Sequence, residues 1–162
     1  MSVPAGILPV MDTSHGVTLA EQLAAIPVTT DADVLARVEE IIEPAARRER
    51  ALWLFFFYSD GTQAPVVVPL EDMPEMPGED DAEVAFHMLR HFYGLSEDDD
   101  LAFVLAICRD GTLELTNSDR RWLRVLQRGI SEYAAPVRMI CLVTPEGVRG
   151  IGPAARAEVA TG

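Results

Sequence analysis

Residues 101–108 read LAFVLAIC, and residues 52–58 read LWLFFFY. Neither run contains a charged residue, whereas a strand with one face in water alternates apolar and polar residues. Continuous apolar runs of this length are typical of strands that are covered on both faces. The two runs therefore predict a buried sheet, and residues 101–108 are expected to form its central strand.

Turn residues on either side of these runs predict further strands. Asp60-Gly61 predicts a hairpin that leads into a strand over residues 64–70, and Pro65 and Pro69 place this strand at an edge of the sheet. Residues 71–81, with two prolines and many acids, predict an exposed loop. Further short strands are expected at residues 137–143 and 148–151, and residues 113–115 are expected to be a brief extended segment.

The remaining segments with regular spacing of apolar residues have the period of a helix. Helices are predicted over residues 18–25, from about Thr30 to Pro44, over residues 82–93, and from about Asn117 to Tyr133. Asn117 or Ser118 is expected to cap the last helix. Its core side is expected to comprise Trp122, Leu123, Leu126 and Ile130.

This order of elements defines the expected fold class. Helices alternating with strands buried on both faces predict a single α/β domain, a mixed sheet with helices on its faces, in the order helices-β-β-α-β-α-β-β. We divide the chain into an N-terminal arm with two short helices at residues 1–48, an α/β core at 49–152, and a flexible tail at 153–162.

The charge of the chain narrows the choice of partners. The 162 residues include 26 acids and 13 basic residues, all of them arginine, for a net charge of -13. Such acidity repels phosphate backbones and anionic lipids, so we expect neither nucleic-acid nor membrane binding. Cys108 and Cys141 lie inside apolar runs and predict two buried, reduced thiols, which favours a cytoplasmic protein.

The order of elements over residues 52–151 resembles the JAB/JAMM metalloprotease-like fold, in its RadC-like branch. The local likeness is the strand ending at Cys108, the loop Arg109-Asp110-Gly111, and a Ser/Thr-x-x-Asp element, Thr116 to Asp119, that opens a helix. In active members of that family the loop carries a His-x-His-Pro pair, which holds a zinc ion together with the aspartate. The resemblance carries over only the aspartate, to Asp119.

The loop offers Arg109 and Gly111 where imidazoles are needed, and arginine does not ligate zinc because it stays protonated. The resemblance thus implies a degenerate member, a pseudoenzyme that binds no zinc. The chain also has no Gly-x-Ser-x-Gly elbow, P-loop or Gly-x-Gly-x-x-Gly motif. We expect no cofactor, and we lean toward a domain that is not an enzyme.

A weaker metal candidate lies on the helix predicted over residues 82–93. Glu83, His87 and His91 are spaced four apart, so that a carboxylate and two imidazoles share one helical face. The alternative, which we favour, is an exposed polar face with stabilising Glu–His contacts.

A basic stripe is the strongest candidate for a binding surface. Arg120, Arg124 and Arg128 are spaced four apart on one helix, and Arg121 lies beside them. We call these four residues the arginine face. Either it is a solvated face paired with nearby acids, or it docks an acidic partner through bidentate contacts to carboxylates.

The sequence therefore predicts a non-catalytic domain that acts through protein–protein contact, with an acidic protein partner or with a second copy. The alternative is a ligand-binding protein or enzyme whose site lies in the 109–119 loop, lined by Arg109, Asp110, Thr116 and Asp119. Open α/β sheets often bind ligands at the carboxyl ends of their strands.

Overall fold

A computed structural model of the chain describes residues 26–58, 60–78, 80–81, 83–87, 90, 101–133 and 136–152. The helix predicted at residues 18–25 and the tail at 153–162 lie outside these ranges. The described elements are α2 (Asp31–Ile41), η1 (Ala46–Arg48), β1 (Ala51–Tyr58), β2 (Gln63–Leu70), β3 (Leu101–Cys108), α4 (Asn117–Tyr133), β4 (Val137–Thr144) and β5 (Gly147–Gly152). The described residues between 80 and 90 are also helical.

The strands form one mixed sheet in the order β2-β1-β3-β4-β5. Only β3 and β4 pair in parallel; the other neighbours are antiparallel. As predicted, β3 is the central strand and β2, with its two prolines, is at an edge. Ala51 at the start of β1 pairs with Cys108 at the end of β3. We call this border, where β3 and β4 end and β1 begins, the carboxyl edge of the sheet.

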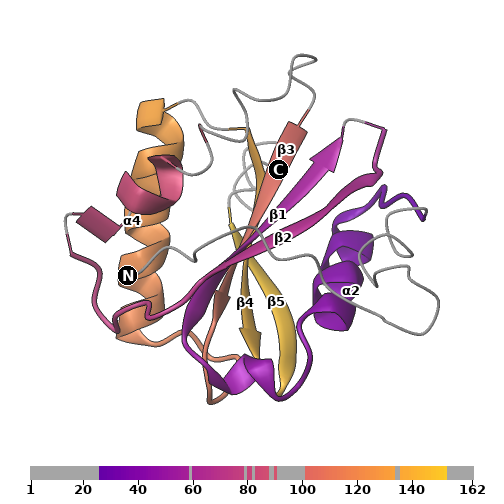
Figure 1. Ribbon diagram of the computed structural model, residues 1–162. Helices are drawn as coiled ribbons and strands as arrows, with labels where there is room; N and C mark the ends of the chain where they lie inside the picture. Colours follow the sequence, from indigo (N-terminus) through magenta and orange to yellow (C-terminus); the bar gives the residue numbers. More distant parts are fainter. Residues whose placement is uncertain are drawn as a thin grey trace, which may run out of the picture.

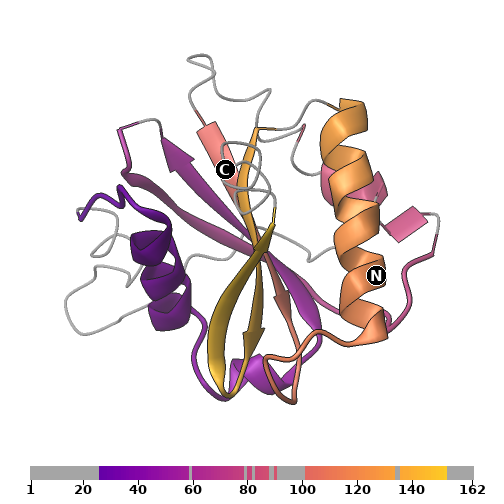
Figure 2. The same cartoon turned by 180° about the vertical axis from the view of Figure 1, so that it is seen from behind.

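Helices cover both faces of the sheet (Figure 1), and the view from behind shows α2 and α4 on opposite sides (Figure 2). Leu52, Leu54 and Phe56 pack in the core beneath α4, while Phe55 and Phe57 pack beneath α2. Alternate residues of β1 thus enter two different cores. This arrangement explains why the strand is apolar throughout, and it confirms the predicted α/β fold class.

Polar contacts define both ends of α2. Thr30 caps its first turn, and the Asp33 carboxylate accepts a hydrogen bond from the Thr30 backbone N–H, completing a capping box. At the other end, the buried Arg47 donates to the carbonyl oxygens of Glu39 and Ile42 at 2.7 and 2.9 Å. These bonds satisfy carbonyl groups that the end of a helix leaves without partners. The helix predicted after Thr30 is thereby confirmed.

The connecting segments after β2 and β3 make contacts that were not predicted, and the prediction for the segment after β2 was wrong. Residues 113–115, expected to be extended, contribute no strand to the sheet, and Leu113 bonds to the side chains of Glu146 and Arg149. The segment predicted as an exposed loop at 71–81 is partly buried, because Met73 belongs to the core and the Trp122 indole donates to the Pro74 carbonyl at 2.9 Å. Helical structure is already present at residues 80–81.

Candidate functional site

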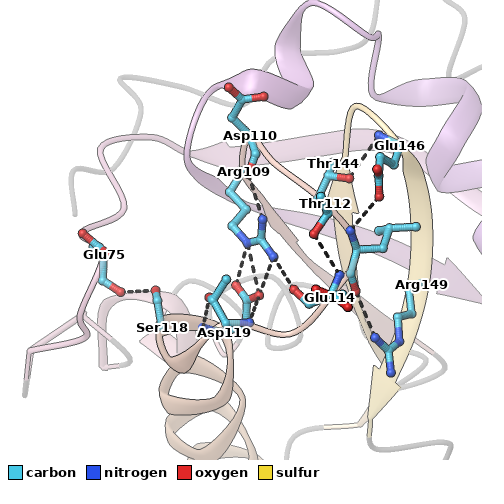
Figure 3. A network of polar contacts seen from close by, with 12 residues as sticks. Glu75, Arg109, Asp110, Thr112, Glu114, Ser118, Asp119, Thr144, Glu146 and Arg149 are labelled. Carbon is cyan, nitrogen blue, oxygen red and sulfur yellow. Dashed lines mark hydrogen bonds and ion pairs between the residues drawn. The ribbon is translucent and has the colours of Figure 1, made fainter.

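The loop after β3 is organised by a buried ion pair. Arg109 directly follows β3, and Asp119 lies in the first turn of α4. The Arg109 Nε donates to Asp119 Oδ1 at 2.9 Å, and its Nη2 donates to Oδ2 at 2.7 Å. Figure 3 shows the two groups facing each other, with side chains only 5% and 0% exposed. The sequence placed both residues at the same candidate site, and the fold brings them into direct contact.

Asp119 is also half of a capping box at the start of α4. The Thr116 backbone N–H donates to Asp119 Oδ2 at 2.9 Å, and the Asp119 N–H donates to Thr116 Oγ1 at 3.1 Å. The cap is therefore Thr116, and the predicted choice of Asn117 or Ser118 was wrong. Ser118 is buried and donates to the Glu75 carbonyl instead, which fastens the segment after β2 to α4.

The remaining Arg109 donors hold the loop itself. Nη1 donates to the Asp110 carbonyl at 2.8 Å, and Nη2 donates to the Glu114 carbonyl at 2.9 Å. Burial alone would raise the pKa of Asp119, but the bonds from Arg109 and Thr116 outweigh it and hold that pKa below its usual value. Both groups are thus charged and bonded to each other. Their evident task is to fix the β3–α4 connection, and a ligand role at this loop stays a prediction.

The four residues of the arginine face are all exposed along α4. Within the part of the chain that the structure describes, none of them forms an ion pair or a side-chain hydrogen bond. Other arginines are engaged: Arg48 pairs with Asp110 at 3.1 Å, and Arg138 lies 3.9 Å from Asp31. The alternative of local pairing with nearby acids therefore has no support among the described residues.

The remaining candidates from the sequence are the weak metal site and the two cysteines. Glu83 and His87 are exposed on the helical segment, and His91 lies outside the described residues. In the described part of the chain, no three His, Cys, Asp or Glu side chains lie close enough together to hold a metal ion. Cys108 and Cys141 are buried and free, as predicted, and the structure places them on the paired strands β3 and β4. Burial raises the pKa of Cys108 to about 12, which leaves its thiol unreactive at neutral pH.

Two hollows that the sequence analysis missed add to this picture. The first, about 410 Å³, lies between the helical segment and α4 and is lined by Phe86, Val125, Arg128 and Tyr133 among others. The second, about 630 Å³, lies at the carboxyl edge, and we call it the edge hollow. It is built from residues before β1, in β1, at the end of β2 and directly after β2. Sequence spacing gives no hint of it because the pairing of β1 with β2 brings those segments together.

Comparison of the chain with protein-family models, curated proteins and solved structures gives no match. Among the helices within the described ranges, none combines the length and apolar character needed to cross a bilayer.

Proposed function

We propose that this domain works through protein–protein contact, with the arginine face as the docking surface for an acidic segment of a partner protein. One observation carries the proposal: the chain has a net charge of -13, yet the four exposed arginines form no ion pair with any residue that the structure describes. An acidic chain supplies many internal carboxylates, so an unpaired basic face is unexpected unless something else binds it. The planar guanidinium grips carboxylates through two parallel hydrogen bonds.

The geometry of α4 favours this surface. Trp122 and Leu126 are fully buried on the core side of the helix, and the Arg109–Asp119 pair fixes its first turn. The arginines therefore project from a rigid element. A rigid surface binds more tightly than a loop because less side-chain and backbone entropy is lost on association.

The resemblance to a degenerate JAB-like, RadC-like domain belongs to the same proposal. In active members an aspartate at the position of Asp119 helps to hold zinc. In this chain the Asp119 carboxylate is engaged by Arg109 and Thr116, and a guanidinium occupies the side that faces β3. These contacts support a pseudoenzyme without zinc chemistry. They also weaken the alternative of a ligand site in the 109–119 loop, because Arg109 and Asp119 neutralise each other and Asp110 pairs with Arg48.

The test is a binding titration with a fluorescently labelled glutamate-rich peptide, read by anisotropy. The wild-type protein is expected to bind it with an affinity that falls as salt rises, since the contact is ionic and exposed. The double variant Arg120→Glu/Arg124→Glu is expected to bind at least about tenfold more weakly, a loss of about 1.4 kcal/mol.

A matched control separates this surface from overall charge. Arg48→Glu/Arg149→Glu changes the net charge by the same amount at two exposed arginines outside α4, which bond to Asp110 and to the Leu113 carbonyl, and thermal unfolding verifies that this variant stays folded. It is expected to weaken binding much less than the α4 variant. Equal losses in the two variants, or affinity that does not respond to salt, would show that the arginine face is not the docking surface. If the α4 variant alone loses binding, the same pair of proteins can identify the natural partner in a lysate.

A further inference from the structure

The edge hollow combines an aromatic wall with an acidic rim. Trp53 of β1 and Pro69 of β2 form part of its wall, and the two residues are directly paired in the sheet. Glu49, before β1, and Glu71, after β2, stand at its rim, and both side chains are exposed. Its volume of about 630 Å³ is within the range of small-molecule sites, roughly 300–1,000 Å³.

Trp53 has an unsatisfied polar group. Its indole Nε1 is buried, and among the described residues it is the one buried side-chain nitrogen or oxygen without a hydrogen-bond partner. The other tryptophan differs, because the Trp122 indole donates to the Pro74 carbonyl at 2.9 Å. A buried donor without an acceptor bears its full desolvation penalty. The Trp53 ring thus has no polar tether, and because Trp53 lines the hollow, an acceptor bound there that reached the N–H would supply the missing bond.

The charges around the hollow favour a cation. Neither the Glu49 nor the Glu71 carboxylate forms an ion pair with another residue that the structure describes. The one basic lining residue, Arg50, donates from Nη1 to Ser118 Oγ at 3.3 Å, so its guanidinium is directed toward the start of α4. Carboxylates at the rim and the indole ring in the wall both attract a positive group, the ring through its negative face.

We propose that the edge hollow binds a small organic cation, an amine or guanidinium that also carries a hydrogen-bond acceptor. Glu49 and Glu71 hold the positive group, the Trp53 ring packs against the apolar part, and the Trp53 N–H bonds to the acceptor. This site is separate from the arginine face and does not depend on the function proposed for it.

The experiment follows the two indole N–H signals by ¹⁵N NMR during titration with argininamide acetylated on its α-amine, so that the guanidinium is its one charge and the amides are its acceptors. Saturable movement of the Trp53 signal is expected, with little movement of the Trp122 signal, which is already bonded. Citrullinamide acetylated in the same way has nearly the same shape and no charge, and it is expected to bind at least about tenfold more weakly. Assignment uses Trp122→Phe, which leaves Trp53 as the single indole.

Variants test the named carboxylates. Glu49→Gln/Glu71→Gln is expected to weaken argininamide binding at least about tenfold, whereas Glu75→Gln, an exposed acid of the same segment outside the hollow, leaves it unchanged. Retained binding in Arg120→Glu/Arg124→Glu is also expected, because the two surfaces are independent. An immobile Trp53 signal, equal binding of citrullinamide, or an unaffected Glu49→Gln/Glu71→Gln variant would each overturn the proposal.

Discussion

The contacts of Arg109 show how one side chain determines a local structure. It joins the end of β3, two loop carbonyls and the first turn of α4 in a single network (Figure 3). Removing one partner of a buried ion pair leaves an uncompensated charge, which costs about 3–5 kcal/mol. Breaking the Arg109–Asp119 pair is therefore expected to lower the stability of the fold, by an amount that depends on pH.

Asp119→Asn is expected to lower the free energy of unfolding by about 3 kcal/mol at neutral pH, because Arg109 then keeps a buried charge without its counterion. The folded-state pKa of Asp119 lies below its usual value. Its stabilising effect is thus present above the unfolded pKa of about 3.9 and is lost as the pH falls through the folded pKa. Urea unfolding of both proteins at several pH values measures the difference.

The gap between wild type and Asp119→Asn should narrow as the pH falls below about 4, because protonation removes the same charge from the wild-type protein. Thr112→Ala serves as the control, since Thr112 is exposed and bonds only to the nearby Glu114 N–H in the described network. A gap that stays constant with pH would mean that the Asp119 charge is not what stabilises the connection.

At the scale of single elements, α4 carries a glycine near its C-terminal end that the aromatic packing requires. A Cβ built on Gly129 would lie 2.2 Å from a ring carbon of Phe86. Phe86 is fully buried and stacks on Tyr133 at 5.7 Å between ring centroids. Glycine inside a helix costs about 1 kcal/mol relative to alanine. The close approach of the ring explains why the helix tolerates that cost.

Gly129→Ala is expected to destabilise the protein by about 1–3 kcal/mol, because overpacking at Phe86 exceeds the gain in helix propensity. Ser131→Ala, at an exposed position two residues along α4, is the control and should be neutral or slightly stabilising. Thermal unfolding of the three proteins compares them directly. A Gly129→Ala protein more stable than wild type would show that the Phe86 ring moves aside without strain.

The elements also differ in how far sequence determines them. β1 and β3 were predictable because both of their faces are buried, which leaves an apolar run without alternation. The start of α2 was predictable from the spacing of Thr30 and Asp33. The start of α4 has the same spacing, Thr116 to Asp119, but Asn117 and Ser118 follow directly and also suit a cap by residue type, and the prediction chose between these two.

Contacts between distant segments account for the other failures. The bonds from Leu113 to Glu146 and Arg149 join segments that are far apart in the sequence, so the local pattern of residues 113–115 could not predict them. The edge hollow depends on the β1–β2 pairing in the same way. The residues of the arginine face were found from spacing alone, because they share one helix. Only the coordinates show that these arginines form no ion pairs with other described residues.

At the scale of the whole molecule, the carboxylates outnumber the arginines that could neutralise them. The chain has 26 acids against 13 arginines, and the most buried ion pair, Arg109–Asp119, uses only one acid. The Arg48–Asp110 pair has both side chains more than half exposed, at 66% and 60%. Exposed pairs of this kind contribute about 0–1 kcal/mol. Repulsion among the remaining carboxylates is therefore expected to oppose the compact state at neutral pH.

Sodium chloride added up to physiological ionic strength is accordingly expected to raise the melting temperature. At that ionic strength the Debye length falls to about 8 Å, so repulsion between the carboxylates is screened. Each kcal/mol gained should raise it by about 2–4 °C for a chain of this size. Arg120→Glu/Arg124→Glu changes the net charge from -13 to -17, by two for each substitution, and should gain more from salt than wild type does. Differential scanning fluorimetry measures both proteins. A wild-type melting temperature that falls with salt would instead mean that attraction between opposite charges outweighs repulsion, and that the exposed arginines already stabilise the isolated fold.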